Sequence, residues 1–453
     1  MKLNKKVVWI IINHFLLIMF ISSQVLAQNN NLTINWDNLD ILLEASDIDS
    51  SDYDIFVDYL DNYGQEPTDY IVEKCKTHQL VILGEWHHLI EYERFVRDII
   101  PDLYYKAGVR YIVFESIIVT HNGKTEALVT GKEYDESLAL EIAQADGYSD
   151  WGDKEYWDIL KAIWELNINL PKDSEPMHAI GMEIPKDYKL DKLWQRNQIE
   201  NKDLIARAES QHLLEMLRDE NMAAAVEQYV LNKGGKGLVL VGQNHSFTHY
   251  SQPFPNVHDP FWTMPFSNKV DAVIIKWPRM GTILYQEYGD RIFQIGLHGP
   301  HTSPRSVTEE LSSLTKQDDD SLLFRFLSAS SPQEQPVIQD LVEKIMTERG
   351  NVPVGFDVVN SPFANLRDRR SYYFHFQPSV RLSDLNRGYI FLKPWKDLTF
   401  SSWMEGYVSQ DLYDNNKIYR MYYDLLYHQD WKNAQEIDNW YRDSWLKLRE
   451  EMR

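Results

Sequence analysis

The stretch "LVILGEWHHLIEYERF", residues 80–95, sets a pattern that later parts of the sequence repeat. Aliphatic residues lead into Gly84, and a carboxylate, Glu85, and two adjacent imidazoles, His87 and His88, follow directly. A short apolar run bounded in this way is typical of a buried strand. The stretch therefore predicts a strand whose carboxyl end carries titratable side chains.

Three further apolar runs also end on polar groups. "GVRYIVFE" closes on Glu115, "HAIGMEIP" contains Glu183, and "GLVLVGQNH" ends at His245. Helical patterns separate these runs, which predicts an α/β fold with a central, mostly parallel sheet flanked by helices. Ligands bind outside the carboxyl ends of the strands in such sheets. We therefore expect Glu85, Glu115, Glu183 and His245 to converge on one site.

The first 27 residues have the features of an export signal. Lys2, Lys5 and Lys6 precede an apolar run that ends at Ala27. Polar residues interrupt the run, which favours a cleaved signal over an uncleaved membrane anchor, the alternative that stays open. We expect an exported protein, periplasmic or secreted, with no stable membrane span after the signal is removed.

The remaining chain divides by its patterns. Residues 28–70 form an acidic N-terminal lead-in, and residues 71–300 form an α/β catalytic domain with a helical insertion at about 120–230. "VDAVIIKW" and "RIFQIGL" predict two further strands. Residues 301–453 are expected to complete the fold and to end in a helical C-terminal extension.

Composition excludes several classes of protein. The chain has 453 residues, with 68 acidic and 46 basic side chains and a net charge of −22. Such a field repels phosphate backbones, so we expect no nucleic-acid partner. Cys75 is the only cysteine, which excludes an intrachain disulfide and a thiolate zinc cluster. We expect Cys75 to be a packing residue.

The available side chains favour direct activation of water. The sequence lacks the H-E-x-x-H spacing of helical zinc sites, so a metal would require ligands from distant segments such as His245, and none is predicted. It also lacks the G-x-S-x-G nucleophile motif, and Ser246 is more typical of a helix cap than of a nucleophile. Imidazoles and carboxylates remain, and these act as general acids and bases without a cofactor.

Two groups of residues allow a simpler interpretation. Arg218 and Asp219 open "RDENMA" and form either a structural ion pair or a group in which Arg218 reaches the strand ends and holds an acid or a substrate oxygen. Several other histidines lack a spacing that ties them to the strand ends, and we expect them on the surface or in loops. They are His249, His258, His298 and His301.

Several motifs occur in a defined order over residues 80–297. G-E-x-x-H-x-x-E is filled by Gly84, Glu85, His88 and Glu91, and "FE" closes on Glu115. "IGME", "RDENMA", "VGQNH" and "MGTILYQEYGDRIFQIG" follow. In this order the motifs resemble the erythromycin esterase-like hydrolases, whose superfamily also includes ChaN-like haem-binding proteins and TIKI proteases.

The resemblance implies a function and a set of site residues. The residues implied to activate water for hydrolysis of a small-molecule ester or lactone are Glu85, His88, Glu115 and His245. The resemblance also implies that Arg218 helps to shape the site. We expect His87, Glu183 and Arg218 to bind the substrate. His87 also creates a G-E-x-H pattern closer to the ChaN-like and TIKI branch. The alternatives are therefore a protein that binds haem or another bulky ligand without turnover, and a metal-dependent peptidase. The sequence carries no signal for the oligomeric state.

Overall fold

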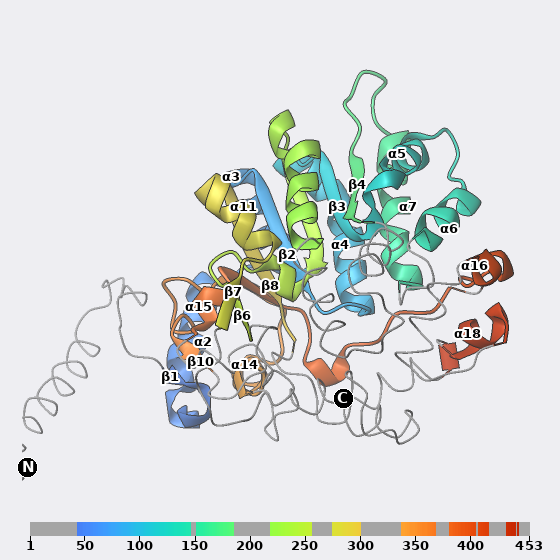
Figure 1. Ribbon diagram of the computed structural model, residues 1–453. Coiled ribbons are helices and arrows are strands. Elements are labelled where there is room, and N and C mark those ends of the chain that lie inside the picture. The colour runs from blue at the N-terminus through green and yellow to red at the C-terminus, as the bar shows by residue number, and fades with distance from the viewer. Residues whose placement is uncertain are drawn as a thin grey trace, which may run out of the picture.

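The described part of the chain covers most of the predicted catalytic domain. The computed structural model describes residues 43–145, 151–184, 218–255, 274–299, 337–367, 380–404, 406–415, 432–440 and 442–443 (Figure 1). The predicted export signal, residues 1–27, lies outside these ranges. No helix within them combines the length and the apolar character needed to cross a bilayer.

A seven-stranded sheet forms the centre of the fold, in the order β4-β3-β5-β2-β8-β11-β9. Its strands are β2 (Leu80–Glu85), β3 (Tyr111–Ile118), β4 (His178–Glu183), β5 (Gly237–Gly242), β8 (Ile292–Leu297), β9 (Val354–Asp357) and β11 (Gly388–Phe391). Neighbouring strands are parallel except for β9, which runs antiparallel to β11. The predicted mostly parallel α/β sheet is therefore confirmed.

Helices cover both faces of this sheet. The longer ones are α2 (Tyr53–Tyr63), α3 (Pro67–Thr77), α4 (Ile90–Asp102), α5 (Asn122–Thr130), α6 (Glu136–Gln144), α7 (Lys154–Ile168), residues 218–229, α11 (Met280–Tyr288) and α14 (Val337–Glu348). The shorter ones are α10 (Gln243–Ser246), α15 (Leu382–Leu385), α16 (Gln410–Asn415) and α18 (Ala434–Trp440). In Figure 1, α5, α6 and α7 lie together beside β3 and β4, and α16 and α18 lie near α6.

Alternating residues of β2 explain the two cores. Successive side chains of a strand point to opposite faces, so Val81 and Leu83 pack with residues of α4 and α7. Leu80 and Ile82 pack on the other face with residues of helix 218–229 and of α11. All residues of β2 are buried, as expected for a parallel strand covered on both faces.

The C-terminal region supplies part of the sheet. β11 and β9 extend it beyond β8, and a third core joins α14 and β9 to α2 of the N-terminal lead-in. β1 (Leu43–Glu44) pairs with β10 (Leu366–Arg367) in the same region. Residues 399–404, here termed the strap, return across the sheet's carboxyl edge and hydrogen-bond to the segments that follow β2 and precede α7.

Two details differ from the sequence predictions. The "VDAVIIKW" segment contributes β7 (Ile274–Trp277), but this strand pairs with β6 (Gln252–Pro255) in a separate two-stranded sheet. His298, expected on the surface or in a loop, is fully buried at the end of β8, between the Tyr389 hydroxyl at 2.8 Å and Glu343 at 3.1 Å. His298 therefore helps to join the sheet to α14, through its contacts with Tyr389 of β11 and Glu343 of α14.

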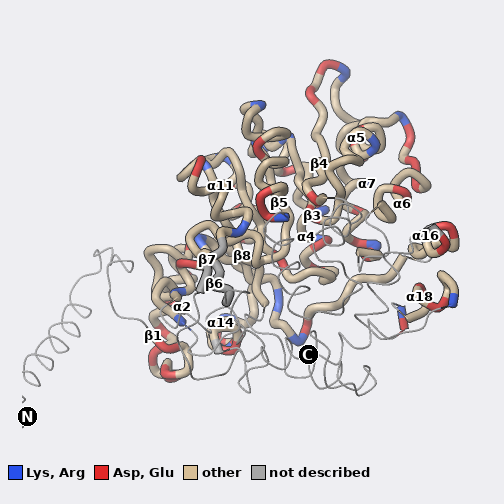
Figure 2. Tube along the Cα trace, in the orientation of Figure 1, with Lys and Arg blue, Asp and Glu red and all other residues tan. Residues whose placement is uncertain are grey.

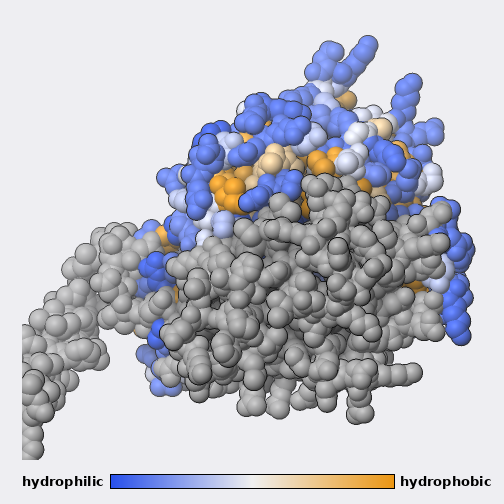
Figure 3. Space-filling view, viewed as in Figure 1, coloured by the Kyte–Doolittle hydropathy of each residue, from blue (hydrophilic) through white to orange (hydrophobic). Residues whose placement is uncertain are grey.

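Charged side chains of both signs are interspersed along the described chain (Figure 2). The described surface is mostly hydrophilic in the view of Figure 3, with smaller apolar areas between the charged residues. Cys75 is buried in α3, and burial raises the pKa of its thiol to about 12. A neutral, buried thiol fits the packing role predicted for it.

Candidate active site

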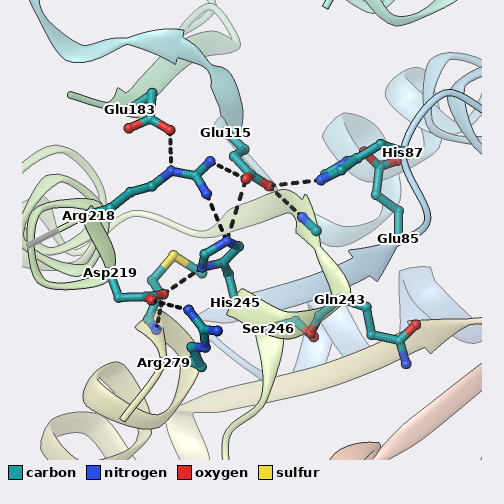
Figure 4. A network of polar contacts seen from close by, with 12 residues as sticks. Glu85, His87, Glu115, Glu183, Arg218, Asp219, Gln243, His245, Ser246 and Arg279 are labelled. Atoms are coloured by element: carbon teal, nitrogen blue, oxygen red, sulfur yellow. Dashed lines mark hydrogen bonds and ion pairs between the residues drawn. The ribbon is translucent and has the colours of Figure 1, made fainter. Parts of the chain in front are cut away.

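Four adjacent strands bring their polar ends together. β4, β3, β5 and β2 are consecutive in the sheet. Glu183 and Glu85 end β4 and β2, and His245 follows β5 in α10. Glu115 lies within β3, directly after Phe114, the last residue that pairs with β5, and the strand continues to Ile118 beyond the predicted end. Figure 4 shows these side chains pointing toward one another. The strand-end cluster is defined here as Glu85, His87, Glu115, Glu183, Arg218, Asp219, His245 and Arg279.

Arg218 links three of the strands. It begins helix 218–229, and its guanidinium donates to Glu183 through Nε and to Glu115 through one terminal nitrogen. The other terminal nitrogen lies 2.9 Å from Nε2 of His245. Of the two interpretations left open for this residue, the contacts match the one in which Arg218 reaches the strand ends rather than pairing with Asp219. A fork of fixed donors suits such a bridge between carboxylates.

His245 is held at both ring nitrogens. Arginine can only donate, so Nε2 of His245 accepts from Arg218 and the ring proton sits on Nδ1. Nδ1 then donates to Asp219 over 2.7 Å. Asp219 also accepts from Arg279 at 3.0 Å and from the Met280 backbone N–H at 2.8 Å. These contacts fix both the tautomer and the orientation of the imidazole.

His87, rather than His88, lies between the two central glutamates. Its Nδ1 is 3.1 Å from Glu85 Oε1, and its Nε2 is 3.7 Å from Glu115 Oε2. Gly242 makes this approach possible, because a Cβ at that position would lie 2.5 Å from His87 Nε2. The sequence analysis grouped His88 with these glutamates as water-activating residues and gave His87 a binding role, whereas in the structure His87 lies between them.

His88 turns away toward a different acid. Its φ of 70° lies in the left-handed region, where residues other than glycine are uncommon, and this turn sends its ring toward Asp153. Nδ1 of His88 contacts Asp153 Oδ2, while the Trp151 ring packs 4.6 Å from the His87 ring and 5.4 Å from the His88 ring. The catalytic role of His88 stays a prediction. Its Nδ1 contacts Asp153, outside the strand-end cluster, and its ring lies 5.7 Å from the ring of His87.

The pKa values of the two central glutamates, Glu115 and Glu85, are shifted in opposite directions. Burial raises the pKa of Glu115, but Arg218, both imidazoles and the Gly242 N–H reverse this and hold it far below its ordinary value. Burial also raises the pKa of Glu85, and the His87 ring only partly opposes it. Asp219 is similar to Glu115, since His245 and Arg279 outweigh its burial and lower its pKa. Glu115 and Asp219 are therefore firmly ionised at neutral pH.

The cluster is built around an organic cation. In the described ranges, no group of three or more His, Cys, Asp or Glu is placed to hold a metal ion. The Arg218 guanidinium lies where the carboxylates of Glu115 and Glu183 converge and supplies their positive partner. Ser246 Oγ is buried and donates to the Gln243 carbonyl at 2.7 Å, which matches a local capping role better than that of a nucleophile.

The predicted site residues thus fall into two places. The structure brings together Glu85, His87, Glu115, Glu183, Arg218 and His245 (Figure 4). The His88 ring lies 5.7 Å from that of His87 and contacts Asp153. Sequence reasoning missed the roles of Asp219, Arg279, Asp153 and Trp151. A signal existed for two of these, because Asp219 and Arg279 lie within or next to the ordered motifs "RDENMA" and "MGTIL".

Several solved structures are distantly similar to this chain. No protein-family model and no curated protein sequence matches this chain. A mutant of the erythromycin esterase EreC in its open conformation is 13% identical, with a TM-score of 0.41, over 71% of this chain and 92% of that one. ChaN of Campylobacter jejuni, solved with cofacial haem, is 12% identical, with a TM-score of 0.31, over 51% and 85%. A Bacillus cereus protein is 12% identical, with a TM-score of 0.39, over 75% and 96%. Similarity this low does not establish a shared activity.

Proposed function

We propose that the protein is a hydrolase that activates water to cleave an ester or lactone bond in a small molecule. One observation carries this proposal. The Nε2 atoms of His87 and His245 face Glu115 at 3.7 and 3.8 Å, while their Nδ1 atoms are held by Glu85 and Asp219. An oriented imidazole beside buried carboxylates suits general acid and base catalysis, and the second imidazole contacts Arg218.

His87 is the proposed base, in place of the predicted His88. The His87 side chain is 28% exposed, whereas that of His245 is 9% exposed and already accepts from Arg218 at Nε2. With a proton on Nδ1 donated to Glu85, His87 presents a basic Nε2. Water therefore reaches His87 more readily than it reaches His245.

The reaction proceeds through these groups in two steps. His87 takes a proton from water as the water oxygen bonds to the carbonyl carbon, and the positive charge of Arg218 stabilises the resulting oxyanion. The carbon–oxygen bond of the ester then breaks, and His87 passes the proton to the leaving oxygen. The products are a carboxylic acid and an alcohol, which together contain all the atoms of the ester and the water. His245 and Glu183 hold Arg218 in position.

The test uses histidine variants on a panel of esters and lactones. We expect His87→Ala and His245→Ala to lower kcat/KM by about 100-fold to 10,000-fold, and His88→Ala to lower it less. His178→Ala is the matched control, because His178 also pairs with a glutamate, Glu126 at 2.9 Å, but lies where β4 begins. Circular dichroism checks the fold of each variant.

Other outcomes would replace the proposal. If His87→Ala hydrolysed esters at the wild-type rate, His87 would not be the general base. A Soret band in the purified protein, with no hydrolysis of any ester, would favour binding of haem or a similar ligand. Loss of activity with a chelator, restored by a divalent metal, would favour the metal-dependent peptidase.

We further propose that the protein acts outside the cytoplasm. The support is the sequence pattern alone, with Lys2, Lys5 and Lys6 before an apolar run that ends at Ala27. N-terminal sequencing of the exported protein is expected to begin near Gln28. Recovery of only the full-length chain from the cytosol would contradict export.

A further inference from the structure

A second group of acids lies next to the strand-end cluster, where α4 packs against α7. The α4 cluster is defined here as His88, Glu93, Asp153 and Ser401. Glu93 comes from the first turn of α4, Asp153 precedes α7, and Ser401 comes from the strap. Glu93 and Asp153 are each 1% exposed, and His88 is 8% exposed. Water therefore does little to stabilise charge on these carboxyl groups.

Each carboxyl group has one satisfied oxygen and one without a donor. Glu93 Oε2 accepts from the Ser401 hydroxyl, and Asp153 Oδ2 contacts His88 Nδ1. Glu93 Oε1 and Asp153 Oδ1 are buried and have no hydrogen-bond partner within the described part of the chain. Buried carboxylate oxygens are rarely left in this state, because the missing hydrogen bond is costly.

The surrounding charges do not supply a second cation. On α4, Arg94 is 53% exposed and pairs with Glu155 of α7 at 3.6 Å. From β2, Glu85 adds another acid, whose partner is His87. The strap contributes hydroxyl and backbone donors rather than charge. Among the described residues, these elements therefore bring two buried carboxyls together with one imidazole, that of His88.

We propose that Glu93 is a protonated carboxylic acid at neutral pH and donates its proton to Asp153, and that the resulting acid–carboxylate pair holds His88. A single proton then satisfies both unpartnered oxygens, because Glu93 Oε1 becomes the donor and Asp153 Oδ1 the acceptor. The Asp153 charge remains and is matched by the His88 Nδ1–H. Glu93 and Asp153 are thus positioning residues that act through His88.

The electrostatics agree with this assignment. Burial raises the pKa of Glu93 well above its ordinary value, and the negative charge of Asp153 raises it further. Both favour the neutral form of Glu93. The Ser401 hydroxyl opposes them only in part.

Positioning of His88 matters for the neighbouring histidine. The Trp151 ring packs against both His87 and His88. A His88 ring in a fixed position therefore helps to hold the Trp151 ring, and with it the His87 ring, in place. The strap also holds the backbone of His88, since the Ser401 N–H donates to the His88 carbonyl at 2.9 Å. The consequence for turnover rests on the proposed function, whereas the protonation state of Glu93 does not.

Infrared spectroscopy of the full chain tests the protonation state directly. At neutral pH, the wild type minus Glu93→Gln difference spectrum is expected to contain the C=O stretching band of a protonated carboxylic acid. Glu155→Gln is the matched control, because Glu155 is buried nearby but accepts from Ser402 and pairs with Arg94. Its difference spectrum is expected to lack that band. Absence of the band from the Glu93 spectrum would overturn the proposal.

Two substitutions at Glu93 then test the positioning role. Glu93→Gln keeps a neutral donor and an acceptor, so kcat/KM and the histidine NMR signal of His88 are expected to stay close to wild type. Glu93→Ala removes the donor to Asp153 and is expected to lower kcat, more than it raises KM, by roughly 10-fold to 100-fold. Equal loss in both variants, or displacement of the His88 signal by Glu93→Gln, would show that an ionised Glu93 is required. If no ester is hydrolysed by the wild type, the infrared and NMR results still decide the proposal.

Discussion

Glu115 and Glu93 are both buried glutamates near the same sheet edge, yet their environments drive them to opposite charge states. Burial raises the pKa of each, but Glu115 is met by a guanidinium, two imidazoles and a backbone N–H, and its pKa falls. Glu93 is met by a hydroxyl and by another acid, and its pKa rises. The number of positive partners, rather than the depth of burial, therefore decides which glutamate carries charge.

The adjacent histidines divide between these two regions. His87 contacts the ionised Glu115 side, whereas His88 contacts Asp153 beside the neutral Glu93. In the first region the charges are balanced by Arg218, and the His87 side chain is 28% exposed. In the second they are sealed beneath the strap and are balanced, on our proposal, by a proton.

The largest effect is expected from removing the cation of the first region. Arg218→Ala leaves Glu115 and Glu183 buried without their shared guanidinium. Breaking a buried ion pair from one side costs about 3–5 kcal/mol. Chemical denaturation at neutral pH is expected to show a loss of this size, together with loss of hydrolysis. Arg218→Lys keeps the positive charge but loses the planar set of guanidinium donors. Its free energy of unfolding should therefore lie between those of the wild type and Arg218→Ala. An Arg218→Ala protein as stable as the wild type would show that Glu115 does not depend on this cation.

Glu115→Gln should destabilise the protein less, and in a pH-dependent way. A carboxyl whose pKa is lowered by folding stabilises the folded state above its unfolded pKa of about 4.3, and this contribution is lost as the pH falls through the folded pKa. The stability gap between wild type and variant should therefore be widest at neutral pH and should narrow in acid. Urea denaturation at several pH values measures it. A gap that does not change with pH would contradict an ionised Glu115.

Glu93→Gln should show the opposite trend with a smaller total change, because the amide preserves both hydrogen bonds. A carboxyl whose pKa is raised by folding stabilises the folded state below its unfolded pKa, and this contribution is lost as the pH rises through the folded pKa. The wild type should lose stability relative to the variant as the pH rises from about 4.3. Thermal unfolding over this range checks the sign. If the stability difference between wild type and Glu93→Gln changed with pH in the same direction as that for Glu115→Gln, the two glutamates would not have opposite charge states.

A solvent-exposed pair gives the smallest expected effect and a reference for the others. Lys154 and Asp158 are 2.8 Å apart at helical i, i+4 spacing, with side chains 59% and 28% exposed. Such pairs contribute about 0.3–0.5 kcal/mol, since water and salt screen them. Lys154→Ala should therefore change the free energy of unfolding by no more than this, and the change should shrink at high salt. A loss comparable to that of Arg218→Ala would mean that charge alone, without burial, sets the energies.

The sequence by itself determined five of the seven strands of the sheet and the position of its polar edge. Apolar runs and helical periodicity are local properties, so they located β2, β3, β4, β5 and β8, and the parallel arrangement placed their carboxyl ends together. Glu85, Glu115, Glu183 and His245 followed from that arrangement. The same reasoning was wrong for His298, because the burial of a strand end depends on α14, which packs over it from a distant part of the chain.

Only the tertiary structure decided which histidine faces the glutamates and which acids are charged. The direction of His87 and His88 depends on a left-handed turn and on the space left by Gly242 of β5, neither of which follows from their own spacing. Asp153 lies 65 positions from His88, and Ser401 lies 308 positions from Glu93. Charge state depends on which donors and cations surround a buried carboxyl, and those neighbours come from segments that meet only when the chain folds.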